Sequence, residues 1–260
     1  MTAGTVHLER RDHVLVIGLD RVAKRNAFDL PLWDGLCRAY GELERDPALR
    51  VGVVHALGEH FTGGLDLPQW AGMFSGKSFV IPDGGLDPLG LYGPRLTKPI
   101  VCAIQGICMT IGIELALATD IRIAAASTRF AQIEIKRGIY PVGGATLRFP
   151  REVGWANAMR WLLTGDEFDA AEALRIGLVQ EVVAHGSQLD RACQLAQVIA
   201  AQAPLGVYAT LASSRQALAA NETRAAERLL PDLQPLLASE DVQEGMRAFL
   251  ARKPGSFKGQ

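Results

Sequence analysis

The stretch KPIVCAIQGICMTIGIELALATDIRIA, residues 98–124, is the part of the sequence that decides the fold. Its first apolar run, 100–104, predicts a buried strand, the glycine-containing segment 106–112 predicts a turn, and 111–119 predicts a buried helix. A second apolar run at 121–124 predicts the next strand. A buried strand, a tight turn, a helix and a further strand are together typical of an α/β fold.

Two glutamates stand in or close to this apolar stretch. Glu114 lies between Ile113 and Leu115, and Glu134 follows twenty positions later in FAQIEIKRGIYPVGG. A carboxylate taken out of water is costly unless it is paired or hydrogen-bonded. One such glutamate alone is more often a helix-start carboxylate that stabilises the fold. Two of them, each in a segment preceded by a glycine turn, favour a pair that handles protons.

The sequence on the N-terminal side continues the α/β pattern. Strands are expected at 6–9 and 13–19, followed by a helix that Asp29 caps and that runs to about Arg45. A third strand is expected at 51–56. The segment 70–95 is distinctive, and its Gly- and Pro-rich part, 75–94, is interpreted as an insertion or a lid.

The C-terminal half is predicted to be mostly helical. A boundary near Ala203 and Pro204 divides an α/β core, residues 1–203, from a helical region, residues 204–260. The expected elements are helices at 144–152, 155–163 and 169–176, a strand at 179–183, and long helices from about residue 187.

Composition and charge exclude several classes of protein. The 260 residues include 27 Lys and Arg against 28 Asp and Glu, and a net charge of -1 argues against a protein built mainly to bind nucleic acid or an acidic membrane. The N-terminus has no apolar run typical of a secretory signal, and the apolar segment 99–118 contains Gln105 and Glu114, so no membrane span is expected. Four cysteines without CxxC spacing predict reduced thiols in a cytoplasmic protein: Cys37, Cys102, Cys108 and Cys193.

Common cofactor motifs are poorly matched. GMFSGKS at 72–78 resembles a phosphate-binding loop, but its spacer is one residue short and no apolar strand precedes it. No GxGxxG opens a helix after a strand, and no GxSxG is present. His55 and His60 lack a third ligand, so they are interpreted as packing or surface residues. We therefore expect no metal and no nucleotide cofactor.

Two glycine turns share one geometric feature. FTGGLDL at 61–67 and GICMTIGIELA at 106–116 let the backbone approach a ligand closely, and each is expected to lead into a helix whose first N–H groups are unpaired. Two such turns can direct two N–H donors at one oxygen and form an oxyanion hole. Taken singly, either turn is better interpreted as a tight loop.

These residues resemble the crotonase superfamily, the enoyl-CoA hydratase/isomerase family. The resemblance covers nearly the whole chain and implies an α/β spiral of ββα repeats with a C-terminal helical region that assembles a trimer or a dimer of trimers. The matching segments are LDRVAKRNAFD, FTGGLDL, residues 98–124, RFAQIEIKRGIYPVGGATLRF, LLTGDEFDAAEALRIGLVQEVV and EGMRAFLARKPGSFKG.

The resemblance also implies a role for individual residues. Leu65 and Ile111 fall where the family supplies two oxyanion N–H groups to a coenzyme A thioester, and Glu114 and Glu134 fall on the two catalytic glutamates. Coenzyme A enters as part of the substrate, so no cofactor is implied. The residues that fall in the substrate- and CoA-binding region are Lys24, Arg25, Ala27, Gly63, Gly64, Asp66, Leu67, Gly112, Phe249 and Lys258.

The expected activity is the reversible hydration of a trans-2-enoyl-CoA. Glu114 is expected to activate water for attack at the β-carbon, and Glu134 to exchange the proton at the α-carbon. Alternatives are a double-bond isomerase, an acyl-CoA hydrolase or lyase, and a noncatalytic acyl-CoA-binding subunit. The sequence departs from the family pattern at Thr110-Ile111-Gly112, where the family usually has Gly-Gly-Gly before the first glutamate. The added side chains predict a smaller pocket.

Overall fold

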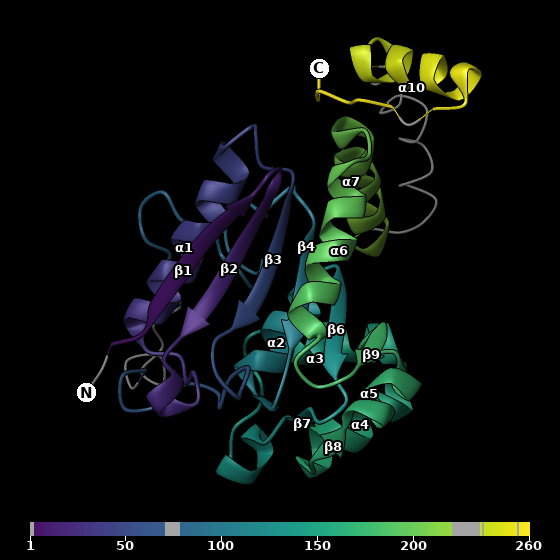
Figure 1. Cartoon of the computed structure of the whole chain (residues 1–260). Coiled ribbons are helices and arrows are strands. Elements are labelled where there is room, and N and C mark those ends of the chain that lie inside the picture. The colour runs from purple at the N-terminus through teal and green to yellow at the C-terminus, as the bar shows by residue number, and fades with distance from the viewer. Residues whose placement is uncertain (1–2, 71–78, 220–234, 236, 254) are drawn as a thin grey trace.

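The computed structural model describes residues 3–70, 79–219, 235, 237–253 and 255–260, and Figure 1 shows their arrangement. The strands are β1 (Thr5–Arg11), β2 (Val14–Asp20), β3 (Val51–Ala56), β4 (Ile100–Ile104), β5 (Ile107–Met109), β6 (Ile121–Ala125), β7 (Arg129–Ala131), β8 (Phe168–Asp169) and β9 (Glu181–Val183). The helices are α1 (Leu30–Arg45), α2 (Ile111–Ala118), α3 (Ala145–Val153), α4 (Trp155–Thr164), α5 (Ala170–Ile176), α6 (Gln188–Ala200), α7 (Pro204–Ala219) and α10 (Glu240–Ala251), with short 3-10 turns η1 (Val22–Lys24) and η3 (Glu134–Arg137).

The larger sheet is built in the order of the chain. Its strands run β1-β2-β3-β4-β6-β9, with β1 antiparallel to β2 and all other neighbours parallel. Each later strand therefore pairs at the edge that the preceding one leaves open. Parallel strands buried on both faces explain why 100–104 reads as an unbroken apolar run.

Two layers of helices cover the two faces of this sheet. Odd-numbered residues of β2, such as Leu15 and Ile17, pack with α1, whereas Val14 and Val16 pack with the small residues of α6. Asp29 caps α1 as predicted, because its carboxylate accepts the Leu32 N–H at 2.9 Å. The predicted α/β core is thus confirmed, with the sheet between α1 and α6.

A second, three-stranded sheet holds the short strands. Its order is β5-β7-β8, with β5 parallel to β7, and Thr62 pairs with Cys108 of β5 at its other edge. The prediction of a simple turn over 106–112 was wrong in part, because 107–109 pairs with β7 before the chain turns at Thr110. A long strand, a short strand and a helix thus follow one another in β4, β5 and α2.

The predicted boundary at residue 203 coincides with the start of α7. The chain bends by 105° between α6 and α7, and Pro204 is the only residue of α7 that is buried. In the part of the chain that the structure describes, no single helix meets the length and hydropathy needed to cross a membrane; α6 and α7 meet them only as a bent pair. The division into two domains remains a prediction.

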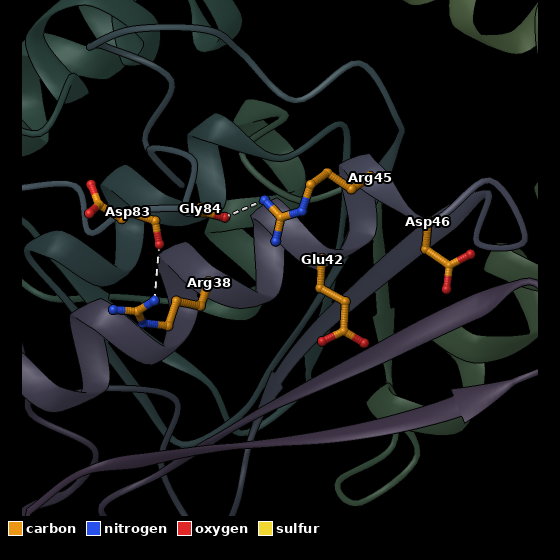
Figure 2. Close-up of a pocket in the computed structure, with 6 residues that line it drawn as sticks. All are labelled: Arg38, Glu42, Arg45, Asp46, Asp83 and Gly84. Carbon is orange, nitrogen blue, oxygen red and sulfur yellow. Dashed lines mark hydrogen bonds between the residues drawn. The ribbon is translucent and has the colours of Figure 1, made fainter.

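The described part of the segment 70–95 lies along α1. The Trp33 Nε1 donates to the Val80 carbonyl at 2.9 Å, and the Leu86 N–H donates to the Cys37 carbonyl at 2.9 Å. A pocket lies where this segment meets α1, and Figure 2 shows the residues that line it: Arg38, Glu42, Arg45, Asp46, Asp83 and Gly84. None of the predicted site residues lines it. The lid remains a prediction, and residues 71–78 lie outside the described residues.

Candidate active site

Three parallel chain segments bring the predicted residues to one edge of the small sheet. The segment at Thr62 lies beside β5, and β5 lies beside β7, all running in the same direction. Their carboxyl ends lead directly into Leu65, into Ile111 and Glu114, and into Glu134. Ligands of α/β proteins commonly bind at the carboxyl ends of parallel strands. The register of the small sheet therefore gathers residues from three separate stretches of sequence.

The two predicted oxyanion donors have free N–H groups. Among the described residues, no hydrogen bond is formed by the N–H of Leu65 or by the N–H of Ile111, whereas Ile113 and Glu114 donate to the Thr110 carbonyl at 2.9 and 3.2 Å. Ile111 is free because it is the first residue of α2. The expected helix after FTGGLDL is not present at 67–70, which form turns, so the Leu65 N–H is free for a different reason.

The Leu65 turn is held by the segment that follows η1. Phe28 donates to the Gly64 carbonyl and accepts from the Asp66 N–H, both at 2.8 Å, which makes Phe28 the parallel bridge partner of Leu65 and leaves the Leu65 N–H without an acceptor among the described residues. The side chain of Ile111 is 2% exposed and belongs to the main core. The Ile111 side chain, which stands where the family usually has glycine, therefore packs into the core. It does not cause the expected loss of pocket volume.

Glu114 lies in α2, and its buried carboxylate contacts the start of the next helix, α3. Its Oε1 accepts the Gly143 N–H at 2.7 Å and the Ala145 N–H at 3.2 Å, at the N-terminus of α3. Burial raises the pKa of Glu114 to about 7, against the opposing effect of these two hydrogen bonds and of the Arg148 charge. A Cβ at Gly143 would collide with the Glu114 Oε2, so only glycine admits the carboxylate there.

Glu134 begins η3 and faces the same region. Its Oε1 accepts from the Gln132 Nε2 at 3.0 Å, and its Oε2 is buried and has no hydrogen-bond partner among the described residues. Burial, together with the negative charge of Glu114, raises the pKa of Glu134 to about 7, against the opposing effect of its hydrogen bonds. The two carboxyl groups are therefore close enough to influence each other, and both change protonation state near neutral pH.

The predicted CoA-contacting residues of the N-terminal half surround the Leu65 turn. Lys24 and Arg25 are exposed, and the Arg25 carbonyl accepts the Gly63 N–H at 2.8 Å. Ala27 is half-buried and Leu67 is 45% exposed in the same segments. The structure thus places the segment that contains Lys24 and Arg25 beside the turn that contains Leu65.

Asp66 and Gly112 have structural contacts of their own. Asp66 pairs with the buried Arg21 at 2.7 Å, which ties the turn to the main core. A Cβ at Gly112 would stand 2.5 Å from the Thr62 Cγ2, so this glycine permits α2 to approach the neighbouring segment. Gly64 adopts a φ of 108°, a conformation that favours glycine.

The two predicted residues of the C-terminal region do not gather with the others. Phe249 belongs to α10, and its side chain lies outside what the structure describes. Lys258 follows α10, where its N–H donates to Asp241 at 2.7 Å. Figure 1 shows α10 and the C-terminus at the end of the molecule away from α2 and β7. Their proposed approach to the ligand therefore requires a neighbouring copy of the chain.

Sequence reasoning missed the groups that hold the two glutamates. Gln132 donates to Glu134, and the N–H groups of Gly143 and Ala145 hold Glu114. The signal for the second contact was the Gly143-Gly144 pair at the start of a predicted helix, because such N-termini bind anions. No group of three or more His, Cys, Asp or Glu residues suited to a metal occurs among the described residues.

Comparison with known proteins gives consistent similarities. The enoyl-CoA hydratase/isomerase family model matches residues 9–260. The chain is 34% identical to the enoyl-CoA hydratase EchA19 of Mycobacterium tuberculosis, over 97% of this chain and 96% of that protein. It is also 34% identical to the carnitinyl-CoA dehydratase of Salmonella paratyphi A, over 98% and 99% of the two chains.

The fold is matched as closely by solved structures. The crystal structure of a probable enoyl-CoA hydratase/isomerase from Mycobacterium abscessus superposes with a TM-score of 0.96 at 50% identity, covering 98% of this chain and 99% of that one. An enoyl-CoA hydratase from M. tuberculosis H37Rv gives a TM-score of 0.89 at 33% identity, covering 98% and 99%. The chain belongs to the enoyl-CoA hydratase/isomerase (crotonase) family and has the α/β crotonase fold.

Proposed function

We propose that this protein is an enoyl-CoA hydratase that adds water reversibly to a trans-2-enoyl-CoA. The observation that carries the proposal is the pair Glu114 and Glu134, two buried carboxyl groups whose pKa values are both raised to about 7. Carboxyl groups that titrate near neutral pH suit general acid and base catalysis. The relatives named hydratase and dehydratase support the addition or removal of water.

The proposed reaction divides the work between the two carboxyl groups. Glu114, ionised, accepts a proton from water while the water oxygen forms a bond to the β-carbon. The electrons of the double bond move toward the thioester, whose oxygen becomes an enolate oxygen held by the N–H groups of Leu65 and Ile111. Glu134, protonated, gives its proton to the α-carbon, and proton exchange with solvent restores both groups. The reverse sequence removes water.

The raised pKa values make this division possible. A carboxyl group at its ordinary pKa of 4.5 is ionised at neutral pH, so it donates no proton. With both pKa values at about 7 and the Glu114 charge disfavouring ionisation of Glu134, a state with one ionised and one protonated group is well populated.

The remaining contacts are proposed for coenzyme A. Lys24 and Arg25 are exposed beside the Leu65 turn, where their charges suit phosphate groups. Ala27, Gly63, Gly64, Asp66, Leu67 and Gly112 are proposed to shape the same region, and Phe249 and Lys258 to approach the adenine end from a neighbouring subunit.

The second candidate activity is double-bond isomerisation. It needs the oxyanion hole and a single acid-base group. The two glutamates have different surroundings: Glu114 is held by two backbone N–H groups, whereas the buried Oε2 of Glu134 finds no hydrogen-bond partner in the part of the chain that the structure describes. A 3-enoyl-CoA distinguishes the two activities, since an isomerase converts it to the conjugated 2-enoyl-CoA.

The test replaces each glutamate with its amide. We expect Glu114→Gln and Glu134→Gln each to lower turnover by roughly 10²- to 10⁴-fold. The loss of absorbance of the conjugated thioester measures hydration across crotonyl-CoA and longer enoyl-CoAs. The exposed Glu59 supplies the control Glu59→Gln, which should leave turnover unchanged. Full activity in both variants contradicts the hydratase proposal, and loss in only one favours the isomerase.

We further propose a trimer or a dimer of trimers in the cytoplasm. Large apolar side chains are exposed on several helices, and surfaces of this kind commonly meet another subunit. The described cysteines Cys37, Cys102, Cys108 and Cys193 are all free and buried, which supports a reducing compartment.

A further inference from the structure

Thr110 has a backbone conformation that its residue type rarely adopts. It stands between β5 and α2 with φ 52° and ψ -112°. Among the described non-glycine residues with positive φ, the others are Asp12, Arg25, Asn26 and Arg252, so Thr110 is the only β-branched one. Branching at Cβ makes this region particularly unfavourable. A glycine at position 110 would adopt it without strain.

The Thr110 side chain does not serve the usual purpose of a threonine at the start of a helix. Its hydroxyl makes no capping hydrogen bond to α2, and no other hydrogen bond to its Oγ1 occurs among the described residues. The Oγ1 instead lies against Gly64, because a Cβ placed on that glycine would stand 2.6 Å from it. The side chain therefore spans the space between two turns of the chain.

These two turns carry the two proposed oxyanion donors. Leu65 follows Gly64, and Ile111 follows Thr110, so the contact joins the residues immediately before each free N–H. The Thr110 backbone is fixed as well. Its N–H donates to the Ala131 carbonyl at 3.0 Å, and its carbonyl accepts from Glu114 at 3.2 Å. One residue thus connects the Leu65 turn, β7 and the first turn of the helix that carries Glu114.

We propose that Thr110 is a positioning residue whose side chain sets the spacing between the Leu65 and Ile111 N–H groups. The inference rests on the proposed function, because it assigns Thr110 a part in polarising the thioester carbonyl. The geometric demand is strict, since donors must stand 2.7–3.1 Å or so from the developing oxyanion. Contact at Gly64 by the Thr110 Oγ1 keeps the two turns from closing on each other.

The kinetic test compares three variants. Thr110→Gly removes both the strain and the side chain; we expect thermal stability equal to or above wild type, turnover lowered by roughly 10- to 100-fold, and a KM changed much less. Thr110→Ser keeps the oxygen against Gly64 and should remain within about threefold of wild-type turnover, the spread expected for a retained contact. Asp12→Gly, in the exposed turn between β1 and β2, relieves a similar φ of 53° far from the site and should leave turnover unchanged.

A spectroscopic readout separates this inference from the proposed activity. Butyryl-CoA labelled with ¹³C at the thioester carbonyl cannot be hydrated, and its carbonyl infrared frequency falls when N–H donors polarise it. We expect a fall on binding to wild type, a smaller one with Thr110→Gly, and recovery with Thr110→Ser.

The outcomes are distinct. An unchanged carbonyl shift or unchanged turnover in Thr110→Gly overturns the role of Thr110, as does failure of Thr110→Ser to recover both. A wild-type shift without hydration of any enoyl-CoA rejects the hydratase and retains the inference when the shift depends on Thr110. A wild-type carbonyl that does not shift rejects the oxyanion hole and, with it, the inference.

Discussion

At the scale of single residues, the site keeps an acid where the fold would be more stable without its charge. Burial raises the pKa of Glu114 from 4.5 to about 7. A group whose folded-state pKa is raised binds more protons when folded than when unfolded, so its contribution to stability is present below pH 4.5 and is lost as pH rises to about 7. The ionised form that the proposed reaction needs is therefore the form that opposes folding.

Because ionisation of Glu114 lowers the stability of the fold, the effect of Glu114→Gln on stability should depend on pH. The amide carries no charge and does not titrate. The difference in free energy of unfolding, variant minus wild type, should therefore increase by about 2 kcal/mol as pH rises from 5 to 8. Urea denaturation at the two pH values measures the difference. Glu59→Gln, at an exposed position, should show no such trend. A difference that is independent of pH would mean that Glu114 titrates at an ordinary pKa.

A second prediction concerns the glycine that makes room for this carboxylate. Gly143→Ala should displace Glu114, since the added Cβ would overlap its Oε2, and should lower turnover by about 10²-fold, the effect expected for a misplacement of roughly 1 Å. Gly206→Ala is the matched control, because among the described residues a Cβ added there meets no atom within 4 Å apart from its chain neighbours and the backbone of its own helix. Steady-state kinetics of both variants checks the prediction; equal turnover would show that Glu114 tolerates displacement.

At the scale of elements, a buried ion pair fixes the start of α1 beside the active site. Asp29 pairs with Arg21 at 3.0 Å, both side chains being 1% exposed, and also accepts the Gly4 and Leu32 N–H groups. Arg21 in turn pairs with Asp66 next to Leu65. The beginning of a helix and a proposed catalytic turn thus share one arginine.

Removal of Asp29 should therefore cost more than the loss of a helix cap. We expect Asp29→Ala to lower the free energy of unfolding by about 3–5 kcal/mol, because the buried Arg21 loses one of its carboxylate partners and the Gly4 and Leu32 N–H groups lose their acceptor. Asp169→Ala removes a comparable but exposed cap from α5 and should cost about 1 kcal/mol. Urea denaturation compares the two. Equal losses would show that the Arg21 pair adds nothing beyond capping.

Elements also show how far the sequence predicts the fold. The strands of the larger sheet and the helices α1 to α5 were predicted in type and within a few residues, because apolar periodicity and the Asp29 cap are local signals. β5, β7 and β8 have only two or three residues each, too few for a period, and exist because of pairing across the chain.

The site divides in the same way. Glu114 and Glu134 stood out as carboxylates in apolar sequence, and the resemblance supplied Leu65 and Ile111. The contacts that set their chemistry, Gln132 to Glu134 and Gly143 to Glu114, join residues by tertiary packing and leave little local trace. The contact of Thr110 with Gly64 depends likewise on the register of the small sheet.

At the scale of the whole molecule, apolar surface predicts assembly. Leu229, Leu230, Leu233 and Leu236, on which the sequence argument partly relied, lie outside the described residues, while Leu237 is 51% exposed. On the described helices, the other large apolar side chains with more than half their area exposed are Leu147, Trp155, Leu163, Val198, Leu218, Met246 and Leu250. Light scattering or sedimentation should give a mass that is a multiple of three 28.0 kDa chains. A stable, active monomer at micromolar concentration would contradict the assembly.

The order of the strands has a consequence for how the chain is made. Because the larger sheet grows in chain order from β1 to β9, each strand that leaves the ribosome meets an edge that is already formed. The face lined by Val16, Val53 and Val101 nevertheless stays uncovered until α6 has been synthesised. A nascent chain that stalls before residue 188 therefore presents a fully paired sheet with one exposed apolar face. Of the surfaces of the larger sheet, this face remains accessible to a chaperone for the longest time.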